Sequence, residues 1–164
     1  MSGFEQIPFG ASEFAENPEP RCPCLLLLDT SASMAGSAID ELNHGLMSFK
    51  RDLSTDPLAL KRVEISMLTF GPVQLISDFQ TADQFAPPLL AGAGDTPIGG
   101  AIISGLEVIR QRKDAYRANG IHYYRPWVFL ITDGAPTDSW QHAADQVRAG
   151  EHAKGFSFFA VGVE

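Results

Sequence analysis

The sequence predicts an α/β fold in which helices cover both faces of a doubly wound, mostly parallel β-sheet. A continuous apolar run at residues 22–29 is typical of a strand buried on both faces, and further strand-forming segments occur at 63–70, 126–132 and 156–163. Between them, apolar residues recur every three or four positions, which is the spacing of amphipathic helices. This alternation predicts parallel strands joined by helical crossovers.

The first helix is expected directly after the apolar strand at 22–29. Ser37 is a suitable amino-terminal cap, since a serine hydroxyl can accept a hydrogen bond from the first turn. The apolar face follows at intervals of three and four residues: Ile39, Leu42, Leu46, Phe49 and Leu53. Asp56 should end the helix, because a residue that precedes a proline avoids the α region.

An antiparallel hairpin and a long helix come next. The strand at 63–70 turns at Gly71-Pro72 into another at 73–79, and so short a connection excludes a parallel crossover. A loop rich in glycine and proline follows at 86–97. The helix at 98–116 directs small and branched residues toward the sheet: Ile98, Ala101, Ile102, Gly105 and Ile109.

The last third of the chain predicts strand, helix and strand. The strand at 126–132 is followed by a short helix, containing Trp140, Ala143, Ala144 and Val147, that Asp138 and Ser139 are expected to cap. The final strand at 156–163 ends the chain, whereas a doubly wound sheet normally continues with a helix and an edge strand. We therefore expect a sheet with one antiparallel edge strand, cut short at its carboxyl-terminal end as in a fragment.

The chain has the length of one domain preceded by a short extension. Its 164 residues can form a core without disulfides. Residues 1–20 contain scattered prolines and acids and predict an irregular segment, laid over the domain by Phe4, Phe9 and Phe14. The domain itself is expected to span residues 21–164.

Charge and composition restrict the partners. Twenty acidic residues against twelve basic ones give a net charge of −8, which disfavours nucleic acid and anionic lipid. The sequence shows neither a signal peptide nor an apolar segment of about 20 residues that could span a membrane. Cys22 and Cys24 are too close for an unstrained disulfide and are expected as free thiols in a reducing, cytoplasmic compartment.

Three polar loops are expected to meet at one edge of the sheet. Residues 29–33 and 132–134 directly follow predicted parallel strands, and residues 95–97 directly precede a helix. Strand carboxyl ends and helix amino ends gather at the ligand-binding edge of an open α/β sheet. The candidate metal ligands are Asp29, Ser31, Ser33, Thr96 and Asp133.

These side chains are all hard oxygen donors. Mg²⁺ prefers six oxygens in near-octahedral geometry, with Mn²⁺ or Ca²⁺ as alternatives, and few direct charges would leave a position for a partner's carboxylate. The simpler interpretation of 29–33 alone is a helix-capping loop, and Asp95 and Asp138 are better explained as caps or solvent-facing groups.

Catalytic motifs are not evident. A haloacid-dehalogenase-type phosphotransferase needs a second aspartate where Ser31 stands, and neither Gly-x-Ser-x-Gly nor a phosphate-binding loop is present. Two alternatives stay open: a phosphatase or hydrolase that uses the cation to activate water, and a structural domain with an empty site. The four histidines show no ligand-like pair, and the aromatic group at 123–127 suits core packing around Arg125 or a partner surface.

Residues 29–34, together with Thr96 and Asp133, have the pattern of a metal-ion-dependent adhesion site. In this the chain resembles von Willebrand factor A domains. The resemblance covers residues 22–163. Other stretches are similar to bacterial TerY-like proteins of tellurium-resistance clusters: Val63–Ser66, Thr69–Gly71, Asp95–Ile102, Tyr124–Trp127 and Phe129–Asp138. Ala32 departs from the glycine usual in that subfamily.

The resemblance implies a role for each ligand. Ser31, Ser33 and in some states Thr96 would bind the metal directly, whereas Asp29 and Asp133 would act largely through bound water. A partner's acidic side chain would complete the metal shell. By this resemblance the protein is a non-catalytic interaction module, an adaptor in a tellurium or chemical stress response beside a phosphatase and a kinase-like protein.

Overall fold

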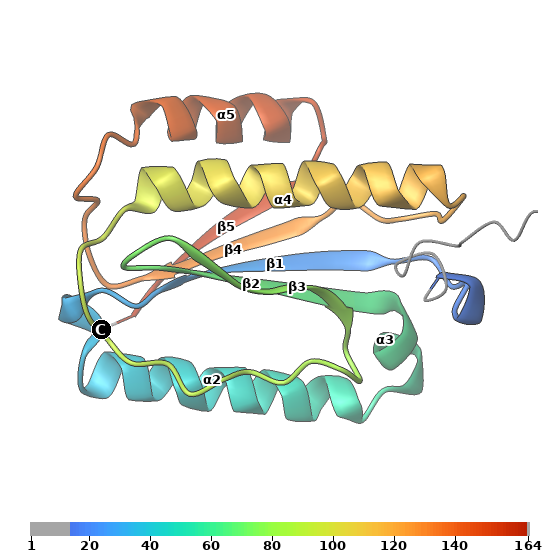
Figure 1. The fold of residues 1–164 in the computed structure, drawn as a ribbon, viewed down its shortest axis with the longest axis horizontal. Helices are drawn as coiled ribbons and strands as arrows, with labels where there is room; N and C mark the ends of the chain where they lie inside the picture. The colour runs from blue at the N-terminus through green and yellow to red at the C-terminus, as the bar shows by residue number, and fades with distance from the viewer. Residues whose placement is uncertain (1–13, 164) are drawn as a thin grey trace, which may run out of the picture.

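The computed structural model describes residues 14–163 and contains a five-stranded sheet with helices on both faces (Figure 1). The strand order is β3-β2-β1-β4-β5, and all neighbours are parallel except β2 and β3. The strands are β1 (Cys22–Asp29), β2 (Val63–Phe70), β3 (Gln74–Thr81), β4 (Trp127–Thr132) and β5 (Ser157–Gly162). The predicted fold class, with its antiparallel edge strand, is confirmed.

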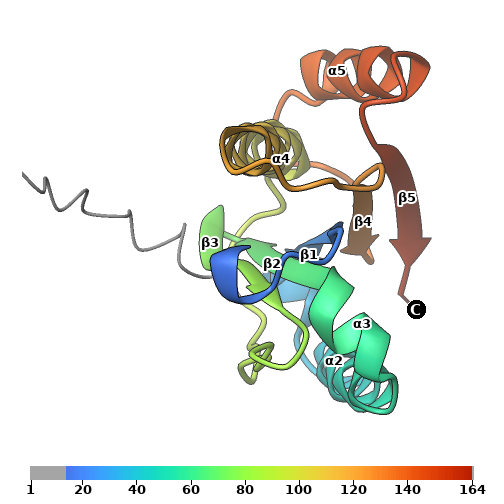
Figure 2. The ribbon, with the colours of Figure 1, turned by 90° about the vertical axis from the view of Figure 1, so that its right-hand side faces the viewer.

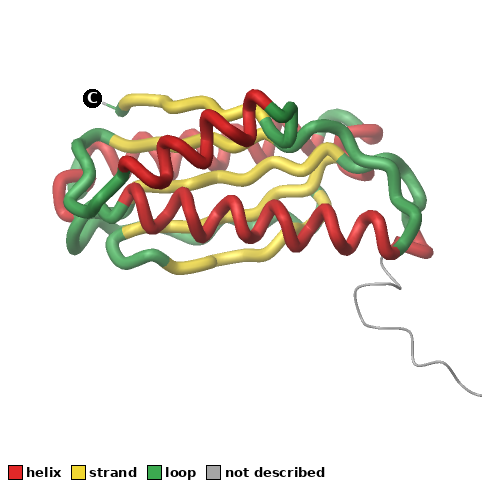
Figure 3. The backbone as a smooth tube through the Cα atoms, turned by 90° about the horizontal axis from the view of Figure 1, so that it is seen from above, coloured by secondary structure: helices red, strands yellow, loops and turns green. Residues whose placement is uncertain are grey.

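The helices lie in two layers, one on each face of the sheet (Figure 2). One layer holds α2 (Ser37–Ser54) and α3 (Pro57–Arg62), and the other holds α4 (Ile98–Ala118) and α5 (Gln141–His152). Seen from the side of this second layer, α4 extends along most of the sheet (Figure 3). Within the described residues, no helix is long and apolar enough to cross a membrane.

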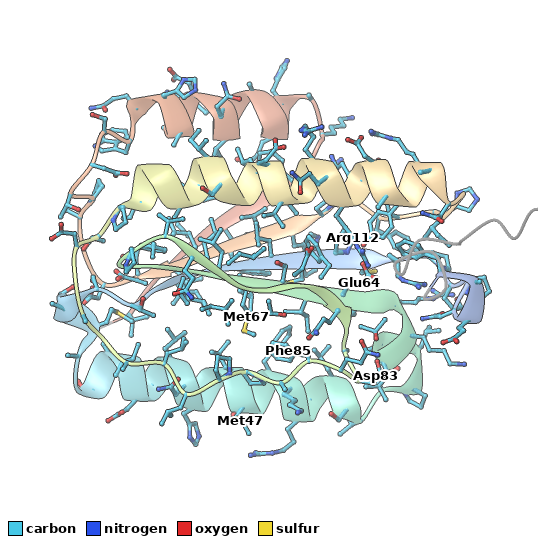
Figure 4. The ribbon with its side chains drawn as sticks, in the orientation of Figure 1. Met47, Glu64, Met67, Asp83, Phe85 and Arg112 are labelled. Carbon is cyan, nitrogen blue, oxygen red and sulfur yellow. The ribbon has the colours of Figure 1, made fainter. Side chains whose placement is uncertain are left out.

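The central strand β1 separates two apolar cores because its side chains alternate between the faces of the sheet. Leu26 and Leu28 pack toward α2 with Met34, whereas Leu25 and Leu27 pack toward α4. Figure 4 shows Met67 and Phe85 in the layer between the sheet and α2. Burial on both faces explains why the sequence of β1 is a continuous apolar run rather than an alternating one.

The predicted serine cap of α2 is wrong, whereas α2 ends ahead of Asp56, as expected. The residue at the amino end of α2 is Gly36, whose φ of 95° favours glycine, and Ser37 is already inside the helix without a capping bond. Asp56 accepts hydrogen bonds from Leu58 N (2.9 Å) and Ala59 N (3.2 Å) and so begins α3, a helix that the sequence analysis missed. Pro57 fits there because the first helical residue needs no amide hydrogen.

The predicted cap of α5 is also wrong for its helix. At the amino end of α5 stands Trp140, without a side-chain cap, and the Asp138 carboxylate instead reaches α4. It accepts hydrogen bonds from Gly99 N (3.0 Å) and Gly100 N (2.8 Å). Gly99 permits this approach, because a Cβ atom there would lie 2.4 Å from the Ser139 carbonyl oxygen.

A buried cluster of charged side chains lies at the amino-terminal ends of the strands. Glu64 on β2, fully buried, accepts hydrogen bonds from Arg21 Nε (3.0 Å), Arg112 Nε (2.9 Å) and the Tyr116 hydroxyl. Figure 4 shows Glu64 and Arg112 facing each other between sheet and α4. Burial raises the pKa of Tyr116 and Glu64 raises it further, so the phenol stays protonated.

Of the three extension phenylalanines, Phe14 is described, and it is 4% exposed. Its ring packs edge-on against Tyr116, with the guanidinium groups of Arg21 and Arg112 at 5.4 and 4.9 Å. Phe4 and Phe9 lie outside the described residues.

Both cysteines are free thiols, as expected. Cys24 is buried in the core beside α2, and burial raises its pKa to about 12; burial also raises the pKa of the half-buried Cys22.

Core packing around Arg125, one of the two interpretations of the aromatic group at 123–127, is wrong for Tyr124 and Trp127, because the chain divides the group between two environments. The alternative of a partner surface stays a prediction. Tyr123 stacks on Tyr116 at 5.2 Å, and the cation near its ring is Arg117, at 6.0 Å. Tyr124 and Trp127 are instead 51% and 55% exposed, respectively.

Candidate metal site

The carboxyl end of β1 supplies the first half of the site. Asp29 is the last residue of the strand and is fully buried. Its Oδ1 atom accepts a hydrogen bond from Ser31 N at 2.8 Å, which turns the chain out of the strand. A short 3₁₀ turn at Ala32–Met34 follows and brings Ser33 back beside Ser31, with 3.0 Å between their hydroxyl oxygens.

The adjacent parallel strand β4 supplies the second half. Leu28 pairs with Ile131, so the next residues, Asp29 and Thr132, leave the sheet side by side. The Thr132 hydroxyl donates to Asp29 Oδ2 at 2.6 Å and accepts from Gly134 N at 3.2 Å. Thr132 therefore fixes both the buried carboxylate and the loop that carries Asp133.

The two halves meet across a hundred residues of sequence. Ser33 Oγ donates to Asp133 Oδ1 at 2.8 Å. Together with the contacts above, this makes one hydrogen-bonded group of two carboxylates and three hydroxyls: Asp29, Ser31, Ser33, Thr132 and Asp133. The structure thus brings together four of the five predicted ligands.

Thr96 lies in the third loop, which packs against the other two. Gly94 O accepts a hydrogen bond from Ala32 N (2.9 Å), and Ala93 N donates to Thr30 O (2.8 Å). Thr96 is buried, and its backbone pairs with Thr137: Thr96 N donates to Oγ1 (3.0 Å), and Thr137 N donates to Thr96 O (2.9 Å). Among the described residues, the hydrogen bonds that join the other four ligands do not include the Thr96 hydroxyl.

The site is closed at its base and open at its rim. Asp29 and Ser31 are 0% and 1% exposed, whereas Ser33 is exposed and Asp133 is half-buried. A small ion can therefore reach Ser33 and Asp133 from solvent while Asp29 holds a fixed charge beneath it.

Basic side chains are missing from the sequence around this edge. No lysine or arginine occurs at 22–49, 63–109 or 126–147, which includes all three loops. Within residues 14–163, no salt bridge involves Asp29 or Asp133. A buried carboxylate is costly unless its charge is compensated, so the site has the electrostatics of a cation site.

The donor set also narrows the choice of ion. In the described residues, no group of three or more His, Cys, Asp or Glu side chains is placed to hold a metal, so carboxylates alone do not make this site. Two carboxylates with neutral hydroxyls fit a hard cation that retains water, as Mg²⁺ does. Asp138 is occupied as a cap of α4, and Asp95 is exposed in the third loop.

The sequence analysis did not assign a role to Thr132 or Thr137. Thr132 was visible as the last residue of a predicted parallel strand, the position equivalent to Asp29. Thr137 gave no comparable signal, because its partner Thr96 is 41 residues away.

Comparison with known proteins supports the fold. The sequence matches no protein-family model and no curated protein. Among solved structures, the chain is similar to proximal thread matrix protein 1 from the mussel byssus, with a TM-score of 0.53 and 19% identity. The similarity covers 89% of this chain but 38% of the mussel chain, so the present chain spans well under half of that structure. At this identity the likeness establishes the α/β fold alone.

Proposed function

We propose that the carboxyl edge of the sheet binds a divalent cation, Mg²⁺ in the first place and Mn²⁺ or Ca²⁺ as alternatives. One observation carries the proposal: the hydrogen-bonded group of Asp29, Ser31, Ser33 and Asp133 stands at a strand edge whose three loops contain no lysine or arginine. Its oxygen atoms already lie within 3.0 Å of their neighbours. A cation supplies the missing positive charge without displacing a basic residue.

Each residue has a distinct part in this proposal. Ser31 and Ser33 offer hydroxyl oxygens to the ion, and Thr96 adds a third when its loop turns toward them. Asp29 and Asp133 hold the ion mainly through bound water, with Thr132 orienting Asp29. Ser33 and Asp133 stand at the solvent side, which leaves a coordination position open outward.

We further propose that the ion serves a protein–protein contact rather than a reaction. A partner's carboxylate fits the open position, because a cation held by neutral hydroxyls keeps much of its charge. This is the mode of von Willebrand factor A domains, and we assign the chain to that class as a non-catalytic module. Similarity to TerY-like proteins favours an adaptor in a tellurium or chemical stress response, with a phosphatase or kinase-like protein of the same system as partner.

Thermal unfolding in the presence of Mg²⁺ tests the site. An ion that binds only the folded chain adds about 2.7 kcal/mol at a hundred times its Kd. For a domain of this size that raises the Tm by roughly 5–10 °C. Asp133→Asn should abolish the rise, while Asp95→Asn, which neutralises an exposed carboxylate in the adjacent loop, should retain it. An unchanged Tm for the wild-type chain at millimolar Mg²⁺ and Mn²⁺ would refute the metal site.

A second measurement separates adhesion from catalysis. Co-purification of the proposed phosphatase or kinase-like partner should require Mg²⁺ and disappear with chelator or with Asp133→Asn. Hydrolysis of a phosphate ester by the wild-type chain that is lost in Asp29→Ala would instead identify a metal-dependent hydrolase.

A further inference from the structure

An exposed loop without polar side chains leads along α2 into the metal site. Residues 86–94 consist only of alanine, proline, leucine and glycine, and most of them are exposed. Leu89 is 88% exposed, more than any other large apolar side chain among the described residues. Surface loops are ordinarily polar, and contiguous exposed apolar surface marks an interaction site.

The main chain of this loop is fixed to α2. The Asn43 side chain binds Leu90 twice, accepting a hydrogen bond from its backbone N at 2.8 Å and donating to its carbonyl oxygen at 2.9 Å. Leu90 packs in the core beside α2, so its neighbour Leu89 is held at the surface. Figure 1 shows the loop running along α2 toward the start of α4, and in Figure 2 it lies on the side of α2 remote from β5.

The same loop packs closely on the loop that follows β1. A Cβ atom at Gly92 would lie 2.6 Å from Ala35 N and 2.9 Å from the carbonyl oxygen of Ser31, a proposed metal ligand. Backbone hydrogen bonds join the two loops at two further points. Leu89 is three residues before Gly92, and three residues span at most about 11 Å. Leu89 and the metal ligands therefore belong to one surface.

Small uncharged residues occupy the surface between Leu89 and the metal ligands. Ala32 and Ala35 are exposed on one loop, as are Ala91 and Ala93 on the other. No charged side chain occurs at 30–39 or at 84–94. The cores of protein interfaces are likewise depleted of charged residues, and short side chains allow another chain to approach closely.

A second large apolar side chain extends this surface along α2. Met47 is 52% exposed and lies one turn after Asn43, on the same side of the helix. Figure 4 shows it on the outer side of α2, away from the sheet. Residues 86–94 with Ala32, Ala35 and Met47 are called the Leu89 surface below.

We propose that the Leu89 surface binds an apolar side chain of the same polypeptide segment whose acidic residue completes the metal shell. This inference rests on the proposed metal-dependent contact and specifies its partner. An extended segment advances about 3.3 Å per residue, so an apolar residue three to five positions from the acidic one reaches Leu89. Asp95, exposed directly after the loop, repels an acidic segment, so binding requires the ion.

A random library of 12-residue peptides displayed on phage tests the proposal on the 164-residue chain. Phage bound in Mg²⁺ are released with chelator, and the selected peptides are synthesised and measured by fluorescence anisotropy. We expect these peptides to combine an acidic residue with an apolar residue three to five positions away. Their binding should be lost in chelator and in Asp133→Asn.

Leu89→Ser is the decisive variant, because so exposed a side chain contributes little to the fold. It should weaken binding of the selected peptides at least tenfold, about 1.4 kcal/mol, and keep the rise in Tm with Mg²⁺. Leu58→Ser, which changes a 48% exposed leucine on α3, is the matched control and should bind as the wild type does.

The outcomes separate this inference from the metal site itself. Equal affinity of Leu89→Ser and wild type for the chelator-released peptides would overturn the inference and leave the metal contact standing. If no chelator-released peptide is recovered although Mg²⁺ raises the Tm, the protein contact fails and the inference fails with it. Self-association of the wild-type chain in Mg²⁺ that Leu89→Ser abolishes would also overturn it, because the occupant would then be a second copy.

Discussion

Replacing Glu64 by glutamine should destabilise the domain more than any other charge change of similar size. Glu64 is fully buried, as is Arg21, while Arg112 is 13% exposed. Glutamine keeps the shape but removes the charge and turns an amide donor toward the guanidinium groups. Breaking one partner of a buried ion pair costs about 3–5 kcal/mol, because the remaining charges stay buried without compensation.

That loss is a large part of a total stability of about 5–15 kcal/mol. We expect the urea midpoint of Glu64→Gln to fall with an unchanged m-value, and the Tm to fall by on the order of 10 °C. Glu107→Gln is the matched control, since Glu107 pairs with Arg110 on the exposed side of α4 and should change little. A Glu64→Gln variant within about 1 kcal/mol of wild type would refute this account of the cluster.

Two further perturbations follow from the structure. Asp138→Ala removes the acceptor of Gly99 N and Gly100 N. We expect chemical denaturation to show that the free energy of unfolding falls by about 1 kcal/mol. If hydrogen exchange shows that only α5 is destabilised, Asp138 is not a cap of α4. The pKa of Cys24 is raised from 9.0 to about 12, so the unfolded chain loses this thiol proton first and stability should fall as pH rises above about 9. The slope, about 1.4 kcal/mol per pH unit between these two values, should be absent in Cys24→Ala if the thiol causes it.

The sheet could be predicted from the sequence because its signals are local. The leucine run of β1 is buried on both faces, and β4 is rich in aromatic and branched residues, so each strand is visible in its own residues. The α2 cap failed for a different reason. Gly36 takes a backbone conformation that favours glycine. Ser37 is a residue type that often caps helices, but it lies inside the helix and makes no capping hydrogen bond.

The candidate site was predictable in part. Asp29 and Asp133 follow parallel strands, and topology alone brings such residues to one edge. The position of Thr96 relative to them depends on its pairing with Thr137. The lack of basic residues in the loops indicates a cation site only once Asp29 is known to be buried. Contacts between loops are set by tertiary packing, which periodicity does not describe.

The hydrogen bond between Ser33 and Asp133 has a consequence for the order of assembly. It joins residues 100 positions apart, so the site is complete only after β4 has docked on β1. Interactions that form after the folding transition state slow unfolding and leave the folding rate nearly unchanged. An ion held by these loops would therefore slow unfolding and lengthen the lifetime of the folded chain, without speeding its folding.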